Sequence, residues 1–423
     1  MRFRATLVVL VLTLAPGVLA QKPSRPQTGS QPKPVTVPMT LDQGRVVIDV
    51  DLALPNGSIE RVRGWVDNGN PDLYLSKRVA GLIGLGIHCD GQVCSGSLGS
   101  PPDALEILIG GMKISLSAMK EIKVPVAPTL APGMSAEINI PSTVLRNYDV
   151  LFNFPDHEFT IGQPGSLKFN GVKGKMLVNA SNGLIQIPSR IDSKNYDLGL
   201  DLGSPINSLS AELFDRFSSA HPDWPHMTGA VGPFNTGDAG DEPKWKLMRL
   251  DRMQYGPLFL TDVAMADGST DRMTGSADRA RISTSGQLGS EALMNYRVGL
   301  DYAHAIVYFD IGRTIKFPGF DVVGLILRPE DDNRFTILAA ADFDGSPSVP
   351  GVQAGDHLVA VDDIPVADST LGQVWSLLEG SPGQERKLTI ERAGKQLTVA
   401  AEVRHFLGNA PGNGEAKEGA KKK

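Results

Sequence analysis

Alternation of apolar and polar residues with a period of two runs through most of the chain, and this pattern predicts short strands. The clearest case is V-V-I-D-V-D-L-A-L at 46–54, followed by Pro55-Asn56-Gly57 and I-E-R-V-R-G-W-V-D at 59–67. Asn-Gly between two alternating segments is a strong hairpin signal. The second strand ends at Asp67, where Gly69 permits a tight turn.

Strand-like stretches of similar length recur in both halves of the chain. They are L-E-I-L-I at 105–109, I-K-V-P-V at 122–126, M-R-L-D-R-M at 248–253 and L-F-L-T-D-V-A-M at 258–265. Helical segments are short, and two of them begin at the candidate N-caps Ser76 and Ser210. The 46 Gly and 30 Pro, with only 6% aromatic residues, also favour strands and turns. We therefore expect a mainly β fold.

Two signatures occur twice in the same order. D-N-G-N-P-D-L-Y-L-S at 67–76 returns as D-L-G-S-P-I-N-S-L-S at 201–210. L-R-N-Y-D-V-L-F-N-F at 145–154 returns as L-M-N-Y-R-V-G-L-D-Y at 293–302. Similar gaps separate the members of each pair, which indicates an internal duplication. The sequence thus predicts two similar β-rich lobes, each of which places one Asp on a tight turn.

Asp67 and Asp201 are the candidate catalytic residues. Hydrolysis of a peptide bond without a metal or a covalent intermediate needs a base to activate water and an acid to protonate the carbonyl oxygen. Two carboxylates about 3 Å apart can serve as both, because like charges at that distance cannot both ionise and therefore share a proton. Gly69 and Gly203 permit the two turns that present them.

On these residues the chain resembles the pepsin-like and retropepsin-like aspartic proteases, which carry D-T/S-G in each lobe and a later hydrophobic–hydrophobic–Gly element. That element is similar to L-G-S-E-A-L at 288–293, and the matching place in the first lobe is Ile140-Pro141-Ser142. The resemblance covers residues 40–165 and 166–315. It implies a duplicated two-lobe aspartic-protease-like β-barrel fold that hydrolyses peptide or protein substrates through an Asp-Asp dyad.

The residues beside the two Asp residues depart from that family. Its Thr or Ser after each Asp supports hydrogen bonds between the lobes, whereas this chain has Asn68 and Leu202 there. Asn can donate and accept hydrogen bonds, and Leu cannot. After the glycines come Asn70 and Ser204, and Ser204 can donate to its neighbouring carboxylate. Three interpretations stay open: a working dyad, an inactive protease-like scaffold that binds peptides or proteins, and an unrelated duplicated β fold whose Asp residues form turns.

A different pattern begins near Phe320. G-V-Q-A-G-D-H-L-V-A-V-D-D-I-P-V at 351–366 is followed by a helical stretch over 370–378 and by a strand hairpin at 387–390 and 397–403. The first of these segments resembles the G-L-x-x-G-D-x-I-x-x-V-D-G-x-x-V stretch of bacterial PDZ domains.

This resemblance implies a PDZ domain over residues 316–407. Such a domain takes a protein C-terminus or an extended segment as an added strand. The peptide-binding residues would be Val323, Gly324, Leu325 and Ile326, with the helix as the other wall of the groove. The alternative is a PDZ fold that packs against the second lobe without binding peptide.

The N-terminus has the features of a secretory signal peptide. Arg2 and Arg4 precede a short apolar run that ends in A-P-G-V-L-A, so we expect residues 1–20 to be removed. Residues 21–39 and 408–423 have little to bury, and we expect a disordered leader and a disordered tail. The mature protein is then periplasmic or secreted.

Cys89 and Cys94 frame C-D-G-Q-V-C, which predicts a small hairpin disulfide in an oxidising compartment, with two free thiols as the alternative. The net charge of −6 and the pI near 5.7 argue against nucleic acid as a partner. The seven His residues show no metal-binding spacing. We expect no metal, no cofactor and no membrane span. Residues 219–245 suggest an irregular insertion in the second lobe.

Overall fold

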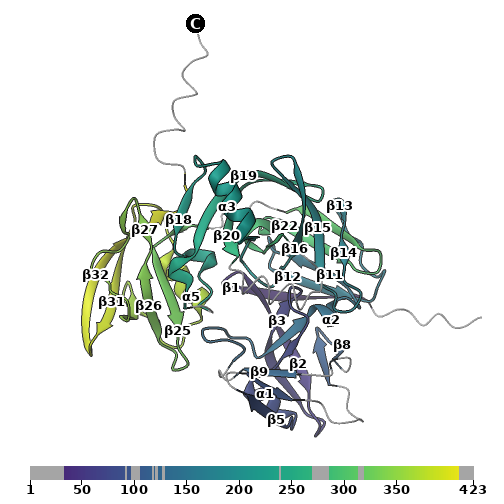
Figure 1. Ribbon diagram of the computed structural model, residues 1–423. Coiled ribbons are helices and arrows are strands. Elements are labelled where there is room, and N and C mark those ends of the chain that lie inside the picture. The colour runs from purple at the N-terminus through teal and green to yellow at the C-terminus, as the bar shows by residue number, and fades with distance from the viewer. Residues whose placement is uncertain are drawn as a thin grey trace, which may run out of the picture. The chain divides into compact units, whose positions relative to one another are not determined.

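The computed structural model describes residues 33–90, 93–96, 105–116, 119, 122–125, 129–237, 240–268, 285–312 and 319–408. The expected signal peptide, the first part of the leader and nearly all of the C-terminal tail lie outside these residues. The described chain is mainly β with a few short helices, which confirms the expectation from the period-two pattern (Figure 1).

The elements of the first repeat follow the order strand, hairpin, D-x-G turn and helix, and then closing strands. They are β1 (Val35–Asp42), β2 (Arg45–Ala53), β3 (Ile59–Asp67), β4 (Leu73–Tyr74), α1 (Lys77–Leu82), β5 (Ile87–Asp90), β6 (Val93–Gly96), β7 (Glu106–Ile109), β8 (Met112–Ser115), β9 (Ile122–Pro125), β10 (Ile138–Pro141), α2 (Ser142–Leu145), β11 (Asp149–Asn153) and β12 (Glu158–Gly162).

The second repeat has the same order of hairpin, D-x-G turn, helix and closing strands. Its elements are β13 (Val172–Lys175), β14 (Leu177–Val178), β15 (Ile185–Ile191), β16 (Lys194–Leu200), β17 (Ser208–Ser210), α3 (Ala211–Ala220), β18 (His226–Thr228), η1 (Gly232–Phe234), η2 (Glu242–Lys244), β19 (Lys246–Tyr255), β20 (Leu258–Gly268), β21 (Gly286–Leu288), η3 (Glu291–Leu293), β22 (Tyr296–Asp301) and β23 (Ile306–Ile311). Ser76 and Ser210 cap α1 and α3 as predicted, since each side chain accepts a hydrogen bond from the N–H three residues on.

The leader is shorter than the sequence suggested. β1 pairs first with β12, with Val35 opposite Ile161, and then with β2, with Met39 opposite Ile48. Pro38 is the last β1 residue paired with β12, and a proline, which cannot donate to a ladder, is tolerated at such a point. Residues 35–39 therefore belong to a strand and not to the leader. The side chains of Val35 and Val37 pack against the core.

The duplicated closing segments pair with each other. β11 and β22 are antiparallel neighbours, with Asp149 opposite Asp301 and Leu151 opposite Gly299. They lie at the middle of one sheet in the order β10-β3-β2-β1-β12-β11-β22-β23-β13, so this sheet takes strands from both repeats. A second sheet, β14-β15-β16-β21-β17-β20-β19-β18, belongs to the second repeat alone.

Each D-x-G strand has a parallel neighbour at the same place in its repeat. β10 runs parallel to β3 with Pro141 opposite Asp67, and β21 runs parallel to β16 with Leu288 opposite Leu200. The next serine of each neighbour donates its backbone N–H to the turn, Ser142 to Asn70 O and Ser290 to Ser204 O. Ile140-Pro141-Ser142 and Leu288-Gly289-Ser290 are therefore equivalent, as the sequence suggested.

The C-terminal unit has its own sheet in the order β25-β26-β29-β31-β32. Its elements are β24 (Asp321–Val322), β25 (Leu325–Pro329), β26 (Phe335–Ala340), β27 (Asp342–Phe343), β28 (Ser346–Pro347), β29 (His357–Val361), β30 (Ile364–Pro365), α5 (Leu371–Leu378), β31 (Glu385–Arg392), β32 (Lys395–Glu402) and β33 (Arg404–His405). The predicted helix and hairpin are thus present, and the helix begins at a Thr370 capping box.

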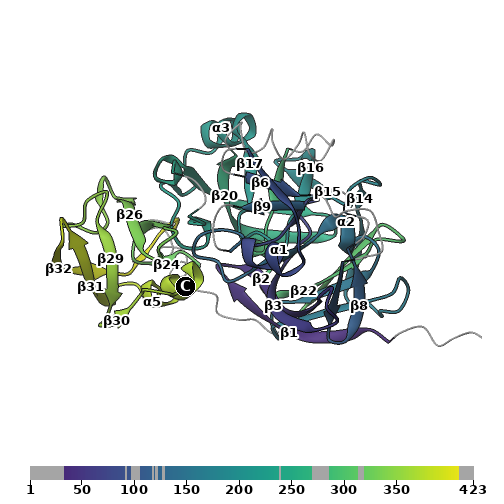
Figure 2. The same cartoon turned by 90° about the horizontal axis from the view of Figure 1, so that it is seen from below.

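Helix α5 lies beside β24 (Figure 2) and packs on the core of this unit together with β25. Leu371, Val374, Trp375 and Leu378 on its inner face are buried with the side chains of β25. Val322 of β24 pairs with Glu379 just after the helix. The same core also contains residues from the second repeat, among them Val231 and Phe234, so the expected irregular insertion is part of this packing.

Candidate active site

The two D-x-G turns approach each other so closely that neither glycine position has room for a side chain. A Cβ on Gly69 would overlap the carboxylate of Asp201. A Cβ on Gly203 would lie 2.8 Å from both Cα and Oδ1 of Asp67. Both glycines are therefore required by the approach of the opposite turn, and the approach is reciprocal. Two Asp residues that are 134 positions apart in the sequence are thus brought to one site.

Backbone N–H groups hold each carboxylate in the same way. The Gly203 N–H donates to Asp201 Oδ1 at 3.1 Å, and the Gly69 N–H donates to the carboxylate of Asp67. The Ser204 N–H also donates to Asp201, while the Ser204 hydroxyl accepts a hydrogen bond from Ile206 N. The serine thus reaches the carboxylate through its backbone, and its hydroxyl stabilises the turn.

Burial and mutual repulsion disfavour two charges at this site. Asp67 is 2% exposed, and its Oδ2 has no hydrogen-bond partner among the described residues. Burial, and then the charge of Asp201, raise the pKa of Asp67 well above its usual range. Burial raises the pKa of Asp201 to about 6, against the N–H groups of Gly203 and Ser204. Above about pH 6, where Asp201 is ionised, the pair therefore retains one proton.

The side chain of Asn68 joins the two turns by hydrogen bonds to the backbone of the opposite turn. Its Nδ2 donates to Leu200 O at 2.8 Å, and its Oδ1 accepts from Leu202 N at 2.7 Å. Asn68 and Leu202 are both fully buried. One carboxamide thus supplies a donor and an acceptor to the opposite turn, so Leu202 contributes only its backbone. Trp65 Nε1 adds a bond to Gly203 O at 2.8 Å.

Two further polar residues act on the carboxylates. Arg45 is buried at the start of β2, and its charge lowers the pKa of both Asp67 and Asp201 against the larger effect of burial. Asn139 is fully buried in β10 and is hydrogen-bonded to Asp67. Neither was singled out in the sequence, although Asn139 interrupts the apolar I-N-I segment and Arg45 directly precedes the apolar V-V-I.

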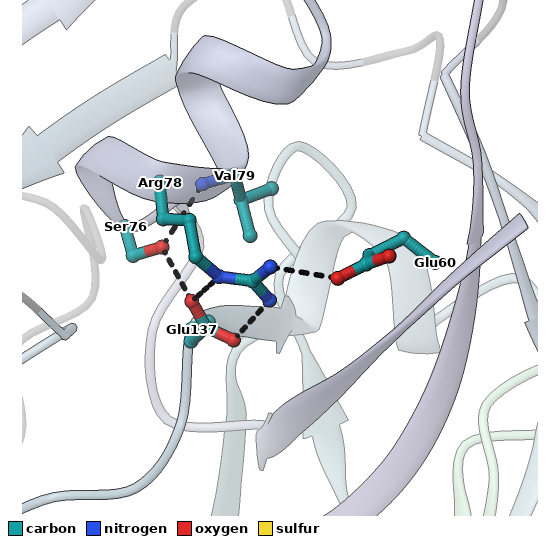
Figure 3. A network of polar contacts seen from close by, with 5 residues as sticks. All are labelled: Glu60, Ser76, Arg78, Val79 and Glu137. Atoms are coloured by element: carbon teal, nitrogen blue, oxygen red, sulfur yellow. Dashed lines mark hydrogen bonds and ion pairs between the residues drawn. The ribbon is translucent and has the colours of Figure 1, made fainter.

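A network on α1 fixes the helix that follows the first turn (Figure 3). Arg78 makes two bonds of 2.7 Å to the carboxylate of Glu137 and one of 2.7 Å to Glu60. Ser76, the helix N-cap, donates to Glu137 at 3.2 Å and accepts from Val79 N at 3.2 Å. The network ties the helix to Glu60 of β3 and to Glu137, the residue before β10. β3 carries Asp67, and β10 carries Asn139.

The other residues singled out in the sequence lie apart from the carboxylate pair. Cys89 and Cys94 form the predicted disulfide across the β5–β6 hairpin, which fits an oxidising compartment outside the cytoplasm. The four residues expected to bind peptide, Val323, Gly324, Leu325 and Ile326, adjoin α5 and are buried. The Val323 N–H is bonded to Leu378 O, and a Cβ on Gly324 would overlap Ser348 and Phe406.

Neither a metal cluster nor a membrane helix is found in the part of the chain that the structure describes. Those residues contain no group of three or more His, Cys, Asp or Glu side chains placed to hold a metal ion. None of their helices is long and apolar enough to span a membrane.

The comparisons with known proteins include a weak structural likeness. No family model matches the chain, and no curated protein matches it. An aspartic proteinase from Irpex lacteus is similar in structure over 66% of this chain and 97% of that chain, with 11% sequence identity and a TM-score of 0.39. A likeness at that TM-score decides neither the fold nor the activity of this chain.

Replacing Asn68 by Ala should destabilise the protein by about 2–4 kcal/mol, because the buried Leu200 O and Leu202 N lose their partners. Urea unfolding followed by tryptophan fluorescence measures this. Asn195→Ala, at an exposed position of β16, serves as the matched control and should change the midpoint little. An Asn68→Ala midpoint equal to that of the control would contradict the bridging role.

The raised pKa of Asp201 makes stability fall as pH rises. The folded state keeps a proton at about pH 6 that the unfolded chain releases near its usual pKa of 3.8, so stability decreases across this window. Asp201→Asn should therefore gain roughly 1–3 kcal/mol relative to the parent between pH 4 and pH 7. Urea midpoints over this range measure the gain. The exposed Asp262→Asn should show no such trend, and a constant difference for Asp201→Asn would contradict the assignment.

Proposed function

We propose that the protein is an aspartic-type peptidase, built from two related lobes over residues 40–165 and 166–315. The observation that supports this most is the reciprocal approach of the two D-x-G turns, which brings together two carboxylates with raised pKa values. Paired carboxylates that share one proton provide acid and base catalysis without a metal or other cofactor.

In this mechanism the two carboxylates have different tasks. Asp201, with the lower pKa of the two, takes a proton from a water molecule whose oxygen attacks the peptide carbonyl carbon. Asp67, which holds its proton to higher pH, donates it to the carbonyl oxygen. When the tetrahedral intermediate collapses, the C–N bond breaks, the departing nitrogen takes the proton that Asp201 had accepted, and the oxygen that re-forms the C=O bond returns its proton to Asp67. Arg45 and the backbone N–H groups keep the charged member of the pair ionised.

The remaining parts of the chain fit an exported peptidase. The charged start and apolar run of residues 1–20 suit a signal peptide, and the disulfide suits a periplasmic or secreted protein. We assign residues 316–407 to a PDZ domain, because the order of the strands and of α5 around the G-V-Q-A-G-D segment suits strand addition at β25. Its ligand would be a substrate or partner segment.

A second function is a protein of the same fold that binds peptides without cleaving them. It is favoured by the near-complete burial of Asp67, whose Oδ2 lies out of contact with solvent. A substrate carbonyl reaches that oxygen only if the turn region opens. Asp201 retains some exposed surface, so a bound peptide would contact this carboxylate first.

The peptidase function predicts that the purified mature protein cleaves casein above about pH 6, where Asp201 is ionised while Asp67 keeps its proton, and that activity falls as pH drops below 6 and Asp201 is protonated. Asp67→Asn and Asp201→Asn should each reduce the rate by at least ~100-fold, because each removes one member of the acid–base pair. Fluorogenic peptide cleavage measures the rates.

Asp262→Asn is the control, because this exposed residue has φ of 56°, a conformation that Asn adopts readily. Cleavage that survives both active-site substitutions would exclude the dyad. Absence of cleavage by the parent, together with measurable peptide binding, would establish the binding protein instead.

A further inference from the structure

The proposed peptide groove, which is the edge of β25 beside α5, is covered by residues of the protein's own chain. β25 lies at the edge of its sheet, so its outer backbone groups would be the place for an added peptide strand. Residues 229–237 of the second repeat lie along this edge. Ala230, Val231 and Phe234 are fully buried there, in the same core as Trp375 of α5.

The contact centres on Asn235. Its Oδ1 accepts from Leu327 N at 3.0 Å, and its Nδ2 donates to Leu327 O at 2.9 Å. Trp375 Nε1 also donates to Oδ1, at 3.2 Å. A carboxamide has the same donor and acceptor as a peptide group. Asn235 therefore makes with Leu327 the two bonds that a residue of an added strand would make.

The segment fits closely on both sides of Asn235. A Cβ on Gly229 would lie 2.8 Å from Ile326 Cδ1, and a Cβ on Gly237 would overlap Pro329. Phe234 packs edge-on against Phe320, with ring centroids 5.3 Å apart. Two glycines and one aromatic residue thus match the groove in shape.

A buried glutamate holds the segment in this conformation. Glu242 is fully buried and accepts hydrogen bonds from Asn235 Nδ2 at 2.6 Å, from Thr236 N at 3.2 Å and from Gly237 N at 3.0 Å. Because the bond to Glu242 already holds the Asn235 side chain, its contact with Leu327 costs little further conformational entropy. Such an arrangement makes the internal contact hard for a free peptide to displace.

The donors that a peptide carboxylate would need are also in use. Val323 N donates to Leu378 O at 2.9 Å, and Leu325 N donates to Val323 O at 2.8 Å. These N–H groups lie at the junction of the preceding loop and β25, where a free C-terminus would bind. The groove in this state suits an internal extended segment better than a chain end.

We propose that residues 229–237 are a built-in ligand of the groove between β25 and α5, so that an added peptide and this segment compete for Leu327. The inference rests on the proposed peptide docking at β25 and describes its regulation. In the resting protein the groove is closed, and docking requires the segment to leave.

The built-in ligand also contacts the turn that leads to the carboxylate pair. Gln43 Nε2 donates to Gly232 O at 2.6 Å and to Asn235 O at 2.9 Å. Asp42, one residue earlier, accepts from Thr370 Oγ1 at 2.8 Å and from Gly372 N at 3.1 Å at the start of α5. Arg45 lies two residues after Gln43 in the sequence. Displacement of the segment would therefore free the turn that positions the Arg45 charge beside the dyad.

The test is binding of a fluorescein-labelled synthetic peptide, G-A-V-G-P-F-N-T-G with blocked ends, to the full chain in a fluorescence anisotropy titration. Asn235→Ala should bind it at least ~10-fold more tightly than the parent, because the parent's own segment competes at a high effective concentration. Asn195→Ala, the control, should bind like the parent. A peptide with Ala in place of its Asn should bind neither protein well.

Equal binding of the peptide by the parent and by Asn235→Ala would overturn the built-in ligand while leaving peptide docking in place. Absence of binding to both would overturn the inference together with the docking. Hydrogen exchange on the parent gives a second readout that does not depend on the variant's folding. Residues 229–237 should exchange as slowly as 325–327, and fast exchange confined to 229–237 would also overturn the proposal. Casein cleavage, assayed separately, reports on the dyad alone.

Discussion

The two hydrogen bonds of the Asn68 carboxamide are the constraint on which the site depends. They join the first D-x-G turn to the backbone on both sides of the second Asp, at Leu200 O and Leu202 N. Both turns are buried there, so breaking the bridge would leave a donor and an acceptor without partners. The reciprocal fit of Gly69 and Gly203 follows from this bridge, and so does the burial that raises the pKa values of the two carboxylates.

The sequence predicted the parts of this arrangement that are local. Period-two alternation placed the β2–β3 hairpin, and the repeated signatures placed Asp67 and Asp201 at equivalent turns. The bridge was out of reach, because Asn68 meets backbone atoms 132 and 134 residues away, and a backbone atom leaves no residue-type signal. Leu202, which seemed to be a lost hydrogen bond, takes part through its N–H. The first part of β1 was assigned to the leader because it follows a stretch rich in Pro, Gln and Ser and contains Pro38, although Val35, Val37, Met39 and Leu41 keep the alternation of a strand.

Residues 229–237, which belong to the segment that seemed irregular in the sequence, cover the edge strand of the C-terminal unit. Residues 229–237 have no strand or helix periodicity, yet they carry Asn235 to Leu327 and share one core with α5. Through Gln43 the same segment reaches the turn that precedes Arg45. The proposed docking groove is thus hydrogen-bonded to the turn that precedes Arg45, and the charge of Arg45 acts on the carboxylate pair.

The most direct test of the account is whether the two carboxylates share a proton. Carboxyl ¹³C chemical shifts of the Asp residues, followed by NMR from pH 3 to pH 8, report this for each residue. The account predicts that Asp67 and Asp201 titrate well above the usual Asp range, and that the pKa of Asp67 falls in Asp201→Asn because the neighbouring charge is gone. Titration of both near pH 4, unchanged by the substitution, would contradict it.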